Sequence, residues 1–189
     1  MKNIQTTEVE FAHIFERTVV VMKDVYGLKV EVKHLDPSIM GDFNGVDIFV
    51  REDLSAEIKL FILAHLFGHS IQFNISERLR TVGMTEYTPH NVNAQVLKRV
   101  KRYEYDASRF ALTLFHNIGI YSLDQWLSDW VAADWSYLQE IYVSGRKEEL
   151  TAEFLHGFKE KYFLPGQPLL TPLPIPKFKP QVWESRFSF

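Results

Sequence analysis

The feature that most constrains this chain is a pair of histidines, His65 and His69, inside an apolar segment. Ser55 can cap a helix that runs to about Ile75, with Glu57 in the first turn, where the helix dipole favours an acidic side chain. Residues four apart lie on one face of a helix, one turn apart. Both imidazoles can therefore reach one metal ion, an arrangement that zinc sites commonly use.

The pair alone is a weak signal, because histidines at this spacing also occur in cores and on surfaces. Here both fall on the apolar face of the helix, and burying two imidazoles without partners is unfavourable. Gly68 lies between them and costs about 1 kcal/mol relative to alanine in a helix. Such a glycine favours close packing, and strands crossing the helix are the candidate neighbour. Together these features favour a shared metal ion.

A second helix, expected over about residues 93–116, carries a glutamate on its inner stripe. The polar side of this helix is basic, with Lys98, Arg99, Lys101 and Arg102, and is most simply a solvated face. Glu104 falls on the opposite, apolar side. A buried carboxylate needs a cation or strong donors, so an ion held by His65 and His69 would suit it, with an arginine partner as the structural alternative. The chain has no cysteine, so a transition-metal site must use His, Asp or Glu.

Hydrophobic spacing predicts three further helices. The first covers residues 8–26 and ends at Gly27, a suitable C′ residue. The others cover residues 122–144 and 147–163. In the helix over 122–144, Trp126 and Trp130 share the apolar stripe expected to face the core, whereas Trp135 falls off it.

Residues 28–50 alternate apolar with polar side chains and predict strands. They contain Asn44-Gly45, a strong hairpin signal. Residues 76–92 are polar and predict a loop. The expected fold class is therefore α+β, with a small antiparallel sheet, a metal-bearing central helix and several packed helices.

Proline content marks a boundary near residue 165, because six of the eight prolines lie between Pro165 and Pro180. Such a segment cannot be helical, yet it is too apolar for a free linker. We therefore expect a domain over 1–164 and a proline-rich tail over 165–189 that packs on it. A further hypothesis is that the tail occupies a peptide cleft and inhibits in cis; unchanged peptide binding after its deletion would exclude that idea.

The two site helices resemble the ImmA/IrrE metallopeptidase family. Residues 63–69 read L-A-H-L-F-G-H and residues 104–111 read E-Y-D-A-S-R-F-A; the family pattern is a β-hairpin, a helix with L-A-H-E-x-G-H and a helix with E-x-x-A-x-x-F-A. The resemblance covers about residues 10–116. It implies a zincin-like α+β core in which His65, His69 and Glu104 bind zinc.

The chain departs from the family at Leu66, which occupies the position of the catalytic glutamate. In zincins that glutamate polarises the water on the metal and carries its proton. Leucine can do neither, and general acid–base catalysis typically contributes about 10²- to 10⁴-fold. The resemblance therefore implies an impaired peptidase. A substitute base is the alternative, with Asp106, His90 and His116 as candidates, although each is more simply a solvated or capping residue.

Members of the family are generally intracellular proteases, several of which cleave transcriptional repressors. The resemblance thus implies a cytoplasmic, metal-binding and catalytically impaired relative that binds a peptide or protein segment, such as part of a repressor. The alternatives are an active zinc endopeptidase with a substitute base, an interaction domain with an empty vestigial site, and a non-haem iron site, which also uses two histidines and a carboxylate. Zinc is the expected metal, with another divalent ion or none as alternatives.

Two global features argue against other partners. The net charge is −3, whereas nucleic-acid binding usually selects for a basic surface. The N-terminal segment shows no secretory signal, and its apolar runs are too short for a membrane span. We therefore expect no direct nucleic-acid contact and no membrane insertion.

Overall fold

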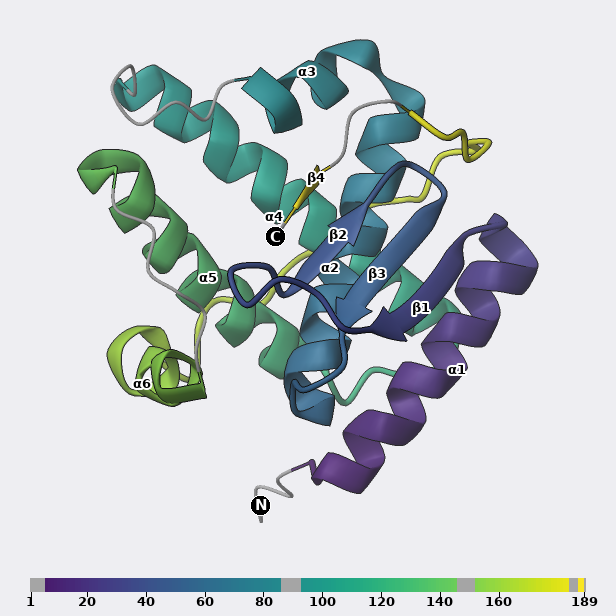
Figure 1. Ribbon diagram of the computed structural model, residues 1–189, viewed down its shortest axis with the longest axis horizontal. Coiled ribbons are helices and arrows are strands. Elements are labelled where there is room, and N and C mark those ends of the chain that lie inside the picture. Colours follow the sequence, from purple (N-terminus) through teal and green to yellow (C-terminus); the bar gives the residue numbers. More distant parts are fainter. Residues whose placement is uncertain (1–5, 86–92, 146–151, 184–186, 189) are drawn as a thin grey trace.

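The computed structural model describes residues 6–85, 93–145, 152–183 and 187–188. Along the chain the elements are α1 (Glu8–Tyr26), β1 (Lys29–Lys33), β2 (Gly41–Phe43), β3 (Asp47–Arg51), α2 (Ala56–Ile75), α3 (Glu77–Thr85), α4 (Ala94–Asn117), α5 (Asp124–Ser144), α6 (Ala152–Tyr162) and β4 (Phe187–Ser188). In Figure 1 the sheet lies in front of α2, with α1 on one side and α4 and α5 on the other. The expected α+β class is confirmed.

The sheet is mixed, with strand order β1-β3-β2-β4. β2 and β3 form the predicted antiparallel hairpin, in which the Asn44 side chain accepts hydrogen bonds from the amides of Val46 and Asp47 and Gly45 has a φ of +101°. β1, however, pairs parallel with β3, so the prediction of a wholly antiparallel sheet is wrong. Residues 34–40 carry the chain past β3, so that β2 is laid down on the far side of β3 and β1 runs in the same direction as β3.

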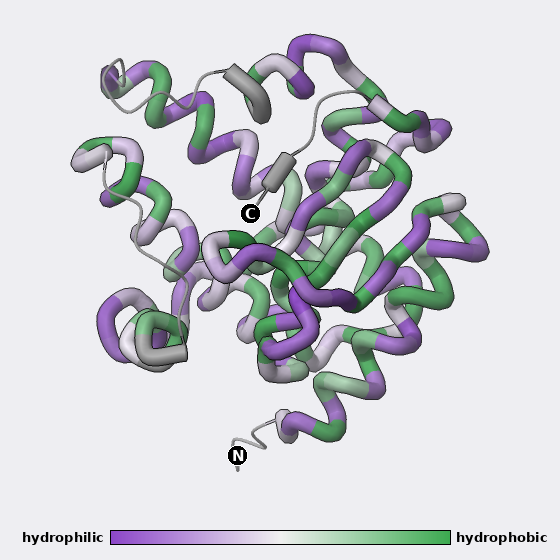
Figure 2. The backbone as a smooth tube through the Cα atoms, in the orientation of Figure 1, coloured by the Kyte–Doolittle hydropathy of each residue, from purple (hydrophilic) through white to green (hydrophobic). Residues whose placement is uncertain are grey.

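α2 is the centre of the fold, because every residue from 60 to 73 is buried. The predicted caps are present: the Ser55 hydroxyl accepts a hydrogen bond from the Ile58 amide, and Gly27 ends α1 in the left-handed conformation. α4, by contrast, has one buried face, and Figure 2 shows hydrophobic and hydrophilic residues alternating along it. An all-round buried helix must be covered on every side, here by the sheet, α1 and α4.

Gly68 marks the place where α2 and α4 touch. A Cβ atom at this position would lie 2.0 Å from the carbonyl oxygen of Ala107 and 2.5 Å from its Cα. The close packing expected of this glycine is therefore real, but the neighbour is α4 and not the sheet. A glycine in α2 is the only residue type that allows this backbone approach.

The prediction of a loop over residues 76–92 is wrong for its first half, which forms α3. The Ser76 hydroxyl accepts a hydrogen bond from the Leu79 amide at the start of this helix. Arg80 donates to the carbonyl of Phe73 at 2.8 Å, and its guanidinium lies 3.6 Å from the Trp183 ring centroid. These tertiary contacts hold a helix whose polar composition resembles a loop. Residues 86–92 lie outside the described residues.

The stripe of α5 reaches the core as expected. Trp130 is buried and Trp126 partly so, and both indole N–H groups donate to Glu57 of α2, at 3.0 and 3.1 Å. Trp135 is also buried, although it is off this stripe, because it packs with Val100 in a second apolar cluster beside α4. No described helix is long and apolar enough to cross a membrane.

The tail is extended over residues 165–183 and contacts several elements of the preceding chain. The Thr113 hydroxyl of α4 donates to the carbonyl of Leu173 at 2.8 Å, and the Gln167 amide donates to Asp129 of α5 at 2.8 Å. The chain then passes the β2–β3 turn, where the Trp183 amide donates to the Asn44 carbonyl at 2.9 Å. Finally, β4 pairs antiparallel with β2.

Candidate metal centre

The structure brings His65, His69 and Glu104 together, as the sequence predicts. Nε2 of His69 lies 2.8 Å from Nε2 of His65 and 3.0 Å from Oε2 of Glu104, and the remaining side of this triangle is 3.1 Å. All three side chains are buried. They form a compact group of two imidazoles and one carboxylate that could hold a metal ion.

The contact between Gly68 and Ala107 explains why the three side chains meet. His65 and His69 flank Gly68 on α2, and Glu104 lies about one turn before Ala107 on α4. Because the two backbones touch at the glycine, side chains one turn away from the contact can converge. The glycine therefore sets the spacing of the site.

Gln72, the next residue on this face of α2, orients one of the histidines. Its amide nitrogen donates to the carbonyl of Tyr103 at 2.7 Å, which fixes the amide so that its oxygen faces Nδ1 of His69 at 2.8 Å. A carbonyl oxygen only accepts hydrogen bonds, so Nδ1 of His69 must carry a proton. In the neutral ring, Nε2 then presents a lone pair to His65 and Glu104. Metal-binding histidines are commonly oriented by such a hydrogen bond on the other ring nitrogen.

The spacing of the three atoms fits a small cation. Ligands of a tetrahedral zinc ion at about 2.0–2.1 Å from the metal lie about 3.3 Å from each other. The observed sides of 2.8, 3.0 and 3.1 Å are shorter by only a few tenths of an ångström, so slight expansion would admit the ion. Two imidazoles and a carboxylate are ligands that zinc accepts, and non-haem iron also uses them.

Electrostatics favours the ligating protonation states. Burial lowers the pKa of His65 to about 4, and the neighbouring His69 acts in the same direction. Burial alone would raise the pKa of Glu104, but His69 and His65 outweigh it and hold that pKa below its ordinary range. A neutral His65 and an ionised Glu104 are the forms that bind a metal.

Leu66 is fully buried and is part of the apolar core. It packs towards β2, because a Cβ atom on Gly41 would lie 2.7 Å from its Cδ1 atom. The position after the first histidine therefore presents a hydrocarbon to the sheet and no group that can accept a proton.

Two of the substitute bases considered from the sequence, Asp106 and His116, pair with residues outside the site. Asp106 pairs with Arg109 at 2.9 Å and with Arg102 at 3.5 Å. His116 pairs with Asp124 at 2.8 Å near the C-terminal end of α4, about three turns from Glu104. His90 lies outside the described residues.

Two side chains near the centre were missed by the sequence analysis. Asp134 of α5 is buried, and both its burial and the charge of Glu104 raise its pKa. The ring of Tyr103 lies 4.8 Å from that of His69, and its buried hydroxyl has no hydrogen-bond partner among the described residues. Asp134 could have been found by the signal that identified Glu104, a carboxylate in line with the apolar stripe of its helix, one turn after Trp130.

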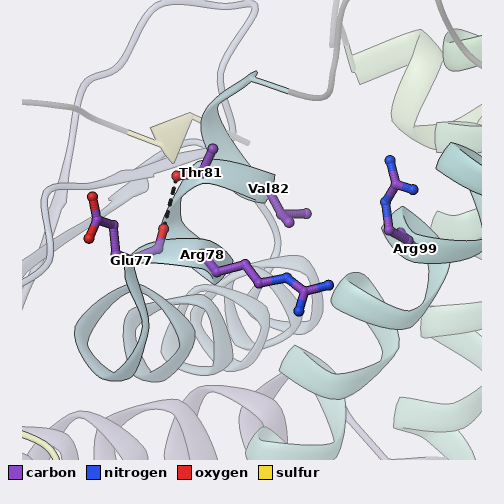
Figure 3. A pocket seen from close by; sticks show the side chains of 5 residues that line it. All are labelled: Glu77, Arg78, Thr81, Val82 and Arg99. Carbon is purple, nitrogen blue, oxygen red and sulfur yellow. Dashed lines mark hydrogen bonds between the residues drawn. The ribbon is translucent and has the colours of Figure 1, made fainter.

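A separate, open pocket lies between α3 and the first turns of α4 (Figure 3). It is lined by Glu77, Arg78, Thr81, Val82 and Arg99. None of the three candidate ligands is among these residues, and the two arginines make its lining unsuited to a cation. The pocket is therefore distinct from the metal centre.

Comparison with known proteins adds no relative from which a function could be carried over. The evidence for a candidate metal centre consequently comes from the geometry described above. No protein-family model, curated protein or solved structure matches this chain.

Proposed function

We propose that this chain is a metal-binding, catalytically impaired relative of the ImmA/IrrE zinc metallopeptidases that binds a peptide or a regulatory protein. The observation that carries the metal site is the buried triangle of Nε2, Nε2 and Oε2 atoms from His65, His69 and Glu104. Three lone pairs at this spacing repel one another unless a proton or a cation lies between them. The hydrogen bond from His69 to Gln72 keeps the proton of the neutral ring on the far nitrogen.

His65, His69 and Glu104 would hold the ion, which in the family is zinc. When bound, zinc supplies a Lewis acid that polarises an oxygen ligand. With Leu66 at this position the chain lacks the general base for catalysis, because a buried leucine cannot accept or return a proton. The family resemblance in turn supports a protein segment as the partner, such as part of a transcriptional repressor, and a cytoplasmic location.

Metal content tests the proposal directly. Protein purified without added metal or chelator is analysed by mass spectrometry, together with His65→Ala, Glu104→Ala and the control His116→Ala, which removes a histidine paired with Asp124 outside the site. We expect about one zinc per chain in the parent and the control, and loss of zinc in the two site variants. A parent protein that stays metal-free even after zinc is supplied would contradict the proposal.

Leu66→Glu tests whether the missing base is what impairs catalysis. If the cleft is intact, restoring the carboxylate should raise peptidase activity by about 10²- to 10⁴-fold. A variant that holds zinc and remains inert would show that the loss extends beyond residue 66.

A further inference from the structure

All three candidate ligands are shut off from solvent. His65 is 1% exposed, His69 0% and Glu104 3%. Two imidazoles and a carboxylate are a ligand set that catalytic zinc sites use, with a fourth position left open, whereas structural zinc sites are closed. A substrate can use an open position only if it reaches the ion. The surroundings of the ligands therefore decide what an ion could do here.

An aromatic stack covers the centre on the side of His65. The Phe61 ring of α2 lies 5.9 Å from the His65 ring. The Trp130 ring of α5 stacks on Phe61 at 5.1 Å, and the Phe158 ring of α6 stacks on Trp130 at 5.9 Å. The Trp130 indole also donates to Glu57 at 3.0 Å, which fixes the middle ring. Three buried rings from three helices thus follow one another from His65 to α6.

Tyr103 and Gln72 cover the centre on the side of His69. The Tyr103 ring is buried and lies 4.8 Å from the His69 ring. The Gln72 side chain is also buried, and it joins Nδ1 of His69 to the carbonyl of Tyr103. Each of the covering side chains on both sides belongs to a helix, and none to a loop that could swing aside as an active-site lid does. Opening the centre therefore requires packed helices to separate.

Leu66 agrees with a centre from which substrate is excluded. Its side chain is fully buried, whereas a general base must come within hydrogen-bond reach of a substrate. What the centre retains is the means to join two helices, since His65 and His69 belong to α2 and Glu104 to α4. A metal ion that binds the folded chain and not the unfolded chain adds its binding free energy to stability.

We propose, building on the metal site of the proposed function, that this is a closed, structural centre: the ion cross-links α2 and α4 inside the core, and the peptide or protein partner binds elsewhere. The ion contributes to the stability of the fold and not to chemistry on a substrate. It follows that Leu66→Glu should hold zinc and remain inert, because a base that no substrate reaches has nothing to act on.

Access is tested on the full chain with two measurements. In protein loaded with Co²⁺, whose visible spectrum depends on its ligands, added acetohydroxamate would change the spectrum if it could reach the ion. We expect the spectrum of the parent to stay unchanged. In protein loaded with Zn²⁺, release to a chromophoric chelator should keep the same rate when the chelator concentration is raised about tenfold, because opening of the helices limits release.

Tyr103→Ala removes a ring that covers His69, and Tyr137→Ala is its matched control. Tyr137 is a buried tyrosine of α5 whose ring lies 5.2 Å from Phe154 and 5.7 Å from Tyr162, so both variants lose one buried ring. We expect acetohydroxamate to change the Co²⁺ spectrum of Tyr103→Ala and to leave that of Tyr137→Ala unchanged. Phe61→Ala opens the other side and replaces Tyr103→Ala if the latter does not fold.

The outcomes separate this inference from the proposed function. A parent spectrum that changes with acetohydroxamate, zinc release that accelerates with chelator concentration, or peptidase activity in Leu66→Glu would overturn the closed centre and leave the metal site standing. An equal response of Tyr137→Ala and Tyr103→Ala would also overturn it, because the change would then report lost stability and not access. A parent that binds neither Zn²⁺ nor Co²⁺ refutes the proposed function and this inference together.

Discussion

Gly68→Ala should damage both the fold and the metal centre, because this glycine lets α2 touch α4. The added Cβ would lie 2.0 Å from the Ala107 carbonyl oxygen and 2.3 Å from its carbon. Both atoms belong to the backbone, so no side chain can rotate out of the way. α4 must therefore move away from α2 by about 1 Å or more to reach ordinary contact distances.

The expected loss of stability is the difference between two opposing effects. Overpacking a well-packed interior costs typically about 1–3 kcal/mol, and backbone contact points to the upper end. Replacing a helical glycine by alanine returns about 1 kcal/mol. The net loss of about 2 kcal/mol corresponds to a fall in melting temperature of about 4–8 °C for a chain of this size.

The same movement should weaken metal binding. Oε2 of Glu104 now lies 3.0 and 3.1 Å from the two imidazole nitrogens. Metal sites tolerate deviations of only about 0.2 Å in ligand distances, so a displacement of α4 by about 1 Å should lower zinc affinity at least about tenfold.

Melting curves and a zinc competition titration would measure both effects, with Gly157→Ala as the matched control. Gly157 lies in α6, and a Cβ atom there would have nothing within 4 Å, so this variant should gain about 1 kcal/mol from helix propensity and keep its zinc affinity. If Gly68→Ala were as stable as Gly157→Ala and bound zinc as tightly, the argument that the glycine sets the spacing of the site would fail.

Two further predictions concern pH and the tail. Burial lowers the pKa of His65 to about 4 from an ordinary value of 6.5, so the unfolded chain binds a proton at His65 more tightly than the folded chain does. The free energy of unfolding of the zinc-free protein, measured by chemical denaturation, should therefore fall as the pH is lowered from 6.5 to 4. His65→Gln should flatten that dependence, and an equally steep profile in the variant would refute the assignment. Trp183→Ala removes the ring that lies 3.6 Å from the Arg80 guanidinium and should lower the free energy of unfolding by about 1–2 kcal/mol. Val182→Ala, at an exposed neighbouring residue, should leave the free energy of unfolding almost unchanged. Equal losses of this free energy in both variants would show that Trp183 does not hold the tail against α3.

Several parts of the site could be predicted because they depend on one helix at a time. The spacing of His65 and His69 follows from the helical repeat, and the inward position of Glu104 follows from the stripe of its own helix. The caps at Ser55 and Gly27 and the turn at Asn44-Gly45 are likewise local, since the residues that make them are neighbours in the chain.

Other parts depend on which elements become neighbours, and local patterns do not contain that information. The alternating residues predicted strands but not the parallel pairing of β1 with β3. The polar composition of residues 77–85 predicted a loop, although contacts such as that of Arg80 with Trp183 hold this segment as a helix. Gly68 indicated a close contact, but the sequence did not show that α4 is the neighbouring element.

The sequence by itself thus determined the three candidate ligands, because the periods of two helices decide which side chains face inward. Only the tertiary structure decided that these side chains meet and that Gln72 orients His69. The physical reason is that backbone geometry within a helix is set by residues three and four apart, whereas convergence of side chains from α2 and α4 is set by the packing of distant segments.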